Sequence, residues 1–172
     1  MNKPWLEHYP PGIPTEIDPD EFRSVPDLLA KSVVRFAGKP AFHNLGHNLT
    51  YAELDRLSRD FAAFLQGLPG MGKGERVAIM APNLLQYPVA LAGILRAGCT
   101  VVNVNPLYTP RELEHQLKDS GADAIFILEN FAHVFQQVAD KVPTKVAVVC
   151  AMGDMLGLLK GLLVNFVVRN VK

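Results

Sequence analysis

The fold is decided by residues 75–128, which read ERVAIMAPNLLQYPVALAGILRAGCTVVNVNPLYTPRELEHQLKDSGADAIFIL. This stretch contains three apolar runs, Val77–Met80, Thr100–Val104 and Ala124–Leu128. None of them shows the apolar–polar alternation of a strand with one wet face. Each run therefore predicts a strand that is covered on both faces, as in a parallel sheet.

The segment between the first two runs carries helix signals. Asn83 and Gln86 have the spacing of a capping box, in which each residue's side chain accepts a backbone N–H of the other. The helix Leu84–Ala97 is apolar on almost every side, and Gly98 is placed to end it in a left-handed conformation. Pro88 lacks a backbone donor, so the helix either kinks there or begins there.

The segment before the third run predicts a second helix. Thr109 is its expected N-cap, Pro110 occupies the first helical position, Glu112 completes a capping box and Gly121 stops the helix. Strand, helix, strand, helix and strand in this order, with short links, predict right-handed βαβ units. The fold class is therefore α/β, with a mostly parallel sheet and covering helices.

A longer pattern surrounds these elements. VAIMAPNLLQYPVALAGILRAG and VVNVNPLYTPRELEHQLKDSGA, with SVPDLL and LTYAELDRLSR upstream, run in order and nearly without gaps. In these residues the chain resembles the adenylate-forming (acyl-CoA synthetase) superfamily, and within it the bacterial long-chain fatty acid–CoA ligases. The resemblance covers nearly the whole chain and implies the N-terminal subdomain of that enzyme fold.

The resemblance implies a two-step reaction. A long-chain fatty acid attacks the α-phosphate of ATP with magnesium to give acyl-adenylate and pyrophosphate, and the thiol of coenzyme A then displaces AMP. In relatives the phosphate loop, the adenine motif, the hinge and the catalytic lysine lie further along. These 172 residues contain no counterpart of them. We therefore expect a truncated, inactive part of a ligase, with no catalytic, cofactor-binding or metal-binding residues of its own.

Two alternatives remain open at this point. One is an adenylate-forming ligase for another carboxylate, such as a medium-chain or aryl acid. The other is a non-catalytic interaction domain built on the same half-fold. A reading frame that continues past Lys172 into an S/T-G-T/S-T/S-G-type loop would favour a ligase. A nucleotide-binding module is disfavoured, because Gly67–Gly74 resembles a phosphate loop but has Gly74 in place of Ser or Thr and precedes a strand.

Composition narrows the class of protein further. Seventeen basic and seventeen acidic residues cancel, so the charge does not favour nucleic acid binding. Cys99 and Cys150 stand in apolar runs, which predicts buried thiols in a reducing compartment. The first residues do not have a signal-peptide pattern, and no apolar run reaches eighteen residues. We expect a cytoplasmic protein, with a peripheral position on the inner membrane as an alternative.

The chain divides into three parts. Residues 1–23 form a proline-rich arm, residues 24–150 the α/β subdomain, and residues 151–172 an amphipathic apolar segment. Trp5 and Tyr9 are expected to anchor the arm on its own domain, the alternative being a second subunit. Within the subdomain, the helix after Thr50 carries one apolar stripe, which we expect to pack in the core. Its residues are Leu54, Leu57, Phe61, Phe64, Leu65 and Leu68.

The last segment carries apolar residues at helical spacing. It either packs on further protein, which we favour, or lies in a membrane interface with its cations toward anionic lipid. An incomplete fold should also expose apolar surface, which predicts a homodimer or other self-association. The residues of the expected helical face are Leu156, Leu159, Leu163, Phe166 and Val167.

The candidate site follows from the sheet. In open parallel α/β sheets, ligands bind beyond the carboxyl ends of the strands. The end of the strand Thr100–Val104 carries Asn103, and the link after it carries Asn105 and Tyr108; none of the three has a predicted role as a helix cap. These three residues are the candidate substrate-side residues. His43 and His47 flank a predicted turn without a third ligand, so a zinc site is not expected.

Overall fold

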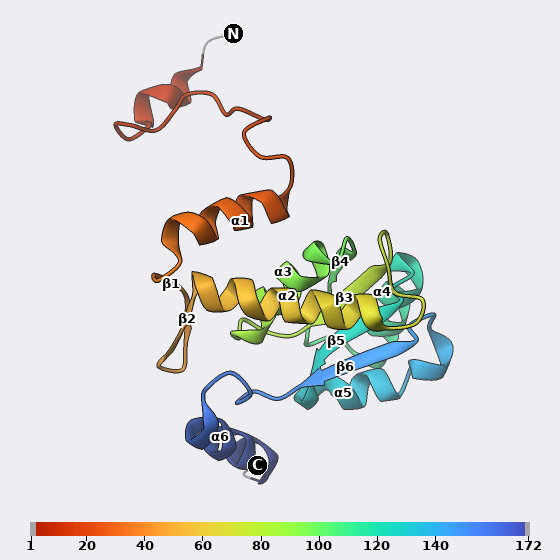
Figure 1. Cartoon of the computed structure of the whole chain (residues 1–172). Coiled ribbons are helices and arrows are strands. Elements are labelled where there is room, and N and C mark those ends of the chain that lie inside the picture. Colours follow the sequence, from red (N-terminus) through yellow and green to blue (C-terminus); the bar gives the residue numbers. More distant parts are fainter. Residues whose placement is uncertain (1–2, 171–172) are drawn as a thin grey trace.

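The computed structural model describes residues 3–170 (Figure 1). Lys172, one of the cations of the last segment, lies outside the described residues. The elements in chain order are η1 (Pro4–His8), α1 (Val25–Phe36), β1 (Pro40–Asn44), β2 (His47–Thr50), α2 (Tyr51–Gly67), β3 (Arg76–Met80), α3 (Gln86–Arg96), β4 (Thr100–Asn103), α4 (Pro110–Ser120), β5 (Ala124–Leu128), α5 (Glu129–Gln136), η2 (Ala139–Lys141), β6 (Val146–Cys150) and α6 (Leu158–Asn170).

The main sheet is parallel, as predicted. Its four strands have the order β4-β3-β5-β6. Val77 pairs with Val101 on one side and with Ala124 on the other, and Ala124 pairs in turn with Val146. The hairpin β1–β2 forms a separate antiparallel pair. The predicted α/β fold with a mostly parallel sheet is confirmed.

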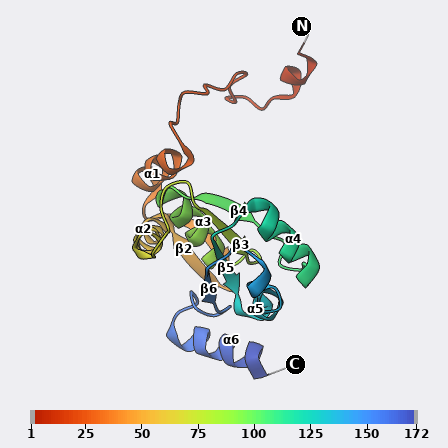
Figure 2. The ribbon, with the colours of Figure 1, turned by 90° about the vertical axis from the view of Figure 1, so that its right-hand side faces the viewer.

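Two helical layers cover the sheet. Val77, Ile79 and Phe126 point to the face covered by α2 and α3. Ala78 and Ile125, their neighbours in sequence, point to the face covered by α4 and α5. Figure 2 shows the sheet between these two pairs of helices. All five residues of β5 are buried, which explains why its sequence shows no polar alternation.

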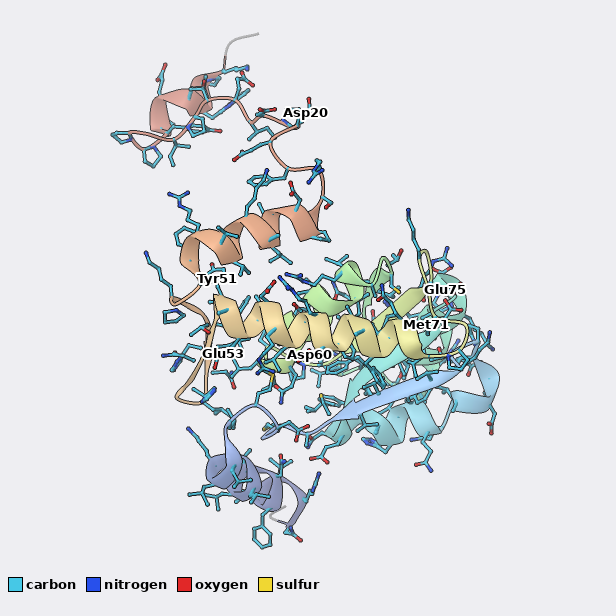
Figure 3. The ribbon with its side chains drawn as sticks, viewed as in Figure 1. Asp20, Tyr51, Glu53, Asp60, Met71 and Glu75 are labelled. Atoms are coloured by element: carbon cyan, nitrogen blue, oxygen red, sulfur yellow. The ribbon has the colours of Figure 1, made fainter. Side chains whose placement is uncertain are left out.

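The predicted capping box of α4 is confirmed, and α2 begins with a second one. In α4, the Thr109 N–H donates to Glu112 Oε2 at 2.8 Å, and the Glu112 N–H donates to Thr109 Oγ1 at 3.4 Å. Gly121 ends this helix in the left-handed conformation, with φ 62°. Thr50 and Glu53 form the same pair at α2, and Figure 3 shows Glu53 at the hairpin end of that helix.

The capping box predicted for Asn83 and Gln86 is wrong. Helix α3 begins at Gln86, and no side chain caps it. The buried Gln86 side chain instead donates to the carbonyl oxygens of Ala151 at 2.8 Å and Met152 at 3.3 Å, beyond the end of β6. A buried amide gains more from these enclosed acceptors than from an exposed local one. Pro88 is the third residue of α3, where its missing donor costs nothing.

Two predictions about apolar side chains are also wrong, one in the N-terminal arm and one on α2. Trp5 and Tyr9 do not anchor the arm, since they are 50% and 41% exposed and the arm extends away from the body (Figures 1 and 2). The arm is rich in prolines and buries no side chain of η1. On α2, Phe64 is 48% exposed, while Leu54 and Leu65 are buried. The ring of Phe64 stacks on that of Phe61 and does not enter the core.

We expect Leu117→Ala to lower the free energy of unfolding by about 2–5 kcal/mol, because a fully buried side chain leaves a cavity. Urea denaturation followed by circular dichroism measures this. The matched control is Leu107→Ala, at a residue that is 79% exposed, which should change stability by less than about 0.5 kcal/mol. Equal effects of the two substitutions would contradict the placement of α4 on the sheet.

Candidate functional site

The candidate site lies at the carboxyl edge of the sheet. All four strands are parallel, so the chain leaves them at the same edge, after Met80, Asn103, Leu128 and Cys150. The starts of α3 and α5 and the segment leading to α6 lie at this edge (Figure 1). The opposite edge carries turns, including the glycine-rich turn between α2 and β3.

Asn103 is the best-positioned of the three predicted residues. Its side-chain oxygen accepts a hydrogen bond from the Tyr87 hydroxyl at 2.9 Å. Its backbone oxygen accepts one from Gln116 Nε2 at 2.8 Å. The residue is exposed, and with its oxygen held by Tyr87 the amide presents its NH₂ group to the surface. Such a group can donate to a carbonyl, carboxylate or phosphate oxygen.

Asn105 and Tyr108 have different surroundings. Asn105 Oδ1 accepts from the Leu107 N–H at 3.0 Å, and its backbone oxygen accepts from the Tyr108 N–H at 3.1 Å. Asn105 therefore holds its own turn. The ring of Tyr108 packs against the core cluster beneath α4. It also borders a surface depression of about 660 Å³ that runs along α4 past Gln116.

Tyr87 joins this region to a second pocket. The pocket measures about 260 Å³ and lies between the hairpin and the start of α3, where Phe42 and Leu84 line it. Asn44 Nδ2 donates to the Asn83 carbonyl at 3.2 Å across the pocket. Sequence reasoning missed Tyr87 and Gln116 as partners of Asn103. Both lie on helices beside β4, and no local pattern distinguishes them from ordinary helix residues.

The residue directly after β5 is charged. It is Glu129, and β5 is one of the two inner strands of the sheet. Arg169 of α6 donates to Glu129 Oε2 from Nε at 3.0 Å and from Nη2 at 2.8 Å. This carboxylate raises the pKa of Arg169. The other oxygen, Oε1, is buried and has no hydrogen-bond partner among residues 3–170. The ion pair fixes the end of α6 over the carboxyl edge.

The cysteines are unsuited to nucleophilic chemistry. Burial raises the pKa of the Cys150 thiol to about 12 and also raises the pKa of Cys99. A thiolate is the nucleophilic form, so both groups are inert near neutral pH. Residues 3–170 do not gather three or more potential metal ligands. His43 Nδ1 instead lies 2.6 Å from Asn48 Oδ1 within the hairpin.

The glycine-rich turn Gly67–Gly74 joins the end of α2 to β3, as predicted. Figure 3 shows Met71 and Glu75 at the end of α2 that is far from the hairpin and from α6. The turn thus lies at the amino edge of the sheet, away from Asn103. A phosphate loop follows a strand and opens a helix. This turn does the reverse.

Comparison with known proteins now identifies the family. The sequence profile of the AMP-binding enzymes matches residues 29–167. The chain belongs to the AMP-binding enzyme family. It is 58% identical over 172 residues to a long-chain-fatty-acid–CoA ligase of Escherichia coli O157:H7, covering 100% of this chain and 31% of that protein. The ligase of the same name from Bacillus subtilis strain 168 is 42% identical over 127 residues, or 74% of this chain and 22% of that protein.

Solved structures share the fold of the chain. A long-chain-fatty-acid–CoA ligase from Archaeoglobus fulgidus matches with a TM-score of 0.70 at 24% identity, covering 91% of this chain and 32% of that chain. A benzoate CoA ligase from Burkholderia xenovorans LB400 matches with a TM-score of 0.68 at 27% identity, covering 81% of this chain and 27% of that chain. The chain thus spans about a third of the length of its relatives.

The capping box beside the depression makes stability depend on pH. Hydrogen bonds from Thr109 lower the pKa of Glu112 from its ordinary value of 4.5. A lowered pKa contributes stability above the unfolded pKa, and this contribution is lost as the pH falls through the folded pKa. The stability of wild type relative to Glu112→Gln should therefore decrease below about pH 4.5. Urea denaturation at several pH values measures this, and a constant difference would contradict the box.

Proposed function

We propose that these 172 residues are the N-terminal part of a long-chain fatty acid–CoA ligase. The reaction consumes ATP, a fatty acid and coenzyme A, and it releases acyl-CoA, AMP and pyrophosphate through an acyl-adenylate. The observation that carries this proposal is the 58% identity over all 172 residues to a ligase of that name. Identity of this extent, within a matching fold, supports the same substrate class.

The residues present do not fit a complete site for ATP and magnesium. Residues 3–170 lack a cluster of metal ligands, and the glycine-rich turn lies at the wrong edge of the sheet. We infer that the nucleotide, the metal and the catalytic groups are held by other parts of a longer protein. Magnesium would there stabilise the charge that develops during phosphoryl chemistry. The 172 residues alone are proposed to be inactive.

The chain's own contribution is a rigid wall at the carboxyl edge. Asn103, whose amide is oriented by Tyr87, donates a hydrogen bond to a substrate oxygen. Tyr108 offers its ring as an apolar surface beside the depression along α4. Asn105 acts indirectly, because its side chain holds the turn that places Tyr108. These are the substrate-side roles that we propose for the three residues.

An aryl or medium-chain acid is the alternative substrate. Structural neighbours include benzoate and anthranilate CoA ligases, but their identities of 27% and 22% are far below the 58% identity to the long-chain ligase of Escherichia coli O157:H7. A non-catalytic interaction domain is the other alternative, and it would need no substrate at all. The experiment below distinguishes all three.

Location and assembly also belong to the proposal. We propose a cytoplasmic protein that self-associates or contacts the inner membrane peripherally. None of the helices in residues 3–170 has the length and apolar character needed to cross a bilayer. The support for both contacts is the exposed apolar surface of α6, where Leu159 is 83% exposed and Phe166 is 62% exposed.

Calorimetric ATP titration and an acyl-CoA assay test the function. The polypeptide encoded by the complete reading frame should bind ATP and form acyl-CoA from a long-chain acid, whereas the 172-residue chain should do neither. Preference for benzoate over a long-chain acid would favour the aryl alternative. Absence of any activity from the complete polypeptide would favour an interaction domain.

In that complete polypeptide, we expect Asn103→Ala to lower kcat/KM by about tenfold, the effect of one lost hydrogen bond of about 1.4 kcal/mol. The control is Asn130→Ala, at an exposed residue of α5. An equal decrease of kcat/KM in the two variants would contradict a contact between Asn103 and the substrate.

A further inference from the structure

The pocket beside the hairpin is separate from the depression along α4. Its volume is about 260 Å³, and its walls come from β1 and from the chain that enters α3. Phe42 and Asn44 line it from β1, and Leu84, Tyr87 and Pro88 line it from the other side. We call this space the hairpin pocket.

Contacts within the chain hold the walls of the hairpin pocket in place. Leu85, one of its lining residues, is 2% exposed and packs in one apolar cluster with Leu49 of β2. This cluster ties the entry of α3 to the hairpin. Across the pocket, Asn44 Nδ2 donates to the Asn83 carbonyl at 3.2 Å. Because the pocket is already formed, a ligand that enters it orders little of the protein.

The lining of the pocket is largely apolar and carries no acidic or strongly basic group. Phe42 and Asn44 stand two residues apart on β1, so their side chains point to the same face of the strand. Asn44 reaches across the pocket, and the Phe42 ring on the same face is 44% exposed. Among residues 3–170, no Asp, Glu, Lys or Arg lines this space. An alkyl chain gains free energy there by leaving water, whereas an ion would lose hydration without gaining a counter-charge.

The depression along α4 has the opposite character. Arg111, Glu112, His115 and Asp119 border it, so most of its lining side chains are charged or titratable. Such a lining does not favour an alkyl chain. Of the two spaces that hydrogen bonds link to Asn103, the hairpin pocket is therefore the apolar one.

Tyr87 connects the hairpin pocket to Asn103. It lines the pocket, and its hydroxyl donates to Asn103 Oδ1 at 2.9 Å. This bond leaves the Asn103 NH₂ group as the free donor. An apolar space and an N–H donor thus lie along one tyrosine side chain. That arrangement matches an amphipathic molecule with an alkyl chain and an oxygen-bearing head group.

We propose that the hairpin pocket binds the alkyl chain of a carboxylic acid whose carboxylate accepts a hydrogen bond from Asn103 Nδ2. Tyr87 is a positioning residue, because its ring forms part of the chain site and its hydroxyl orients the head-group donor. The volume lies below the range of about 300–1,000 Å³ that is typical of ligand pockets, so a long chain fills it with only one section. The inference rests on the proposed function only for the role of this acid as substrate.

The test uses 1-octanol and octanoate as probes of the 172-residue chain, without ATP, magnesium or coenzyme A. A nuclear magnetic resonance titration at pH 7 gives the Kd of each probe from the amide shifts. Both should bind, with the shifts concentrated at Leu84 and Tyr87. Octanoate should bind at least about fivefold more tightly, because its ionised carboxylate accepts a charge-assisted bond. No binding of either probe, or shifts centred elsewhere, overturns the proposal.

Phe42→Glu tests the contact with the alkyl chain. It places a charge on the apolar wall at an exposed residue and should weaken 1-octanol binding at least about tenfold. The matched control is Val34→Glu, at a residue of α1 that is 86% exposed, and its Kd should equal that of wild type. Circular dichroism verifies that both variants are folded. Equal 1-octanol affinity in Phe42→Glu and the control overturns the proposal.

A measurement on wild type keeps the test decisive if Phe42→Glu does not fold. Nuclear Overhauser contacts between the 1-octanol methylenes and the Tyr87 ring support the chain site. Their absence in the saturated complex overturns it.

Tyr87→Phe tests the head-group contact. It keeps the ring in the pocket and removes only the hydroxyl that holds Asn103 Oδ1. We expect unchanged affinity for 1-octanol and loss of the preference for octanoate, with the same pattern in Asn103→Ala. Weakening of both probes alike would indicate a merely structural role of the hydroxyl and overturns the proposal. Retention of the octanoate preference in either variant overturns it as well.

Failure of this site and failure of the ligase assignment give different results. Acyl-CoA formation by the polypeptide from the complete reading frame, without octanoate binding by the 172 residues, overturns the alkyl-chain site and keeps the ligase. Octanoate binding with the expected pattern in the variants, without acyl-CoA formation, supports the site and contradicts the ligase.

Discussion

The structure depends on the burial of β5 from both sides. Ala124–Leu128 is buried at every position, so each face of this strand needs a layer of helices and each edge needs a neighbouring strand. β3 and β6 supply the edges, and their parallel direction requires crossover connections. Those connections contain the helices that form the layers. The same parallel direction gathers the ends of all four strands, and hence the candidate site, at one edge.

The elements whose signals are local were predictable. Thr109 and Glu112 stand three residues apart and cap α4 through contacts that involve only themselves. The run Ala124–Leu128 matches β5 at both ends because burial on both faces leaves a simple apolar signature. The strand order β4-β3-β5-β6 is different, since it depends on which edges meet after collapse. No residue pattern within one strand encodes its neighbours.

Where a polar side chain had a choice of partners, local reasoning failed. Gln86 has the spacing of a capping residue, yet it binds carbonyl groups 65 and 66 residues away. The exposed local bond competes with water, whereas the buried Gln86 amide would be left unsatisfied without these carbonyl groups. Asn103 shows the same limit. The carboxyl-edge rule placed it at the site, but its orientation by Tyr87 comes from packing between α3 and β4.

The rim of the carboxyl edge is therefore built from long-range polar contacts. Gln86 joins the start of α3 to the chain after β6, and Arg169 joins the end of α6 to the start of α5. Each contact links elements that the core alone does not align, because apolar packing is not directional. Directional hydrogen bonds at the rim and non-directional apolar burial beneath it therefore have different structural roles. The core holds the strands together, and the rim positions both the residues around Asn103 and the outward surface of α6.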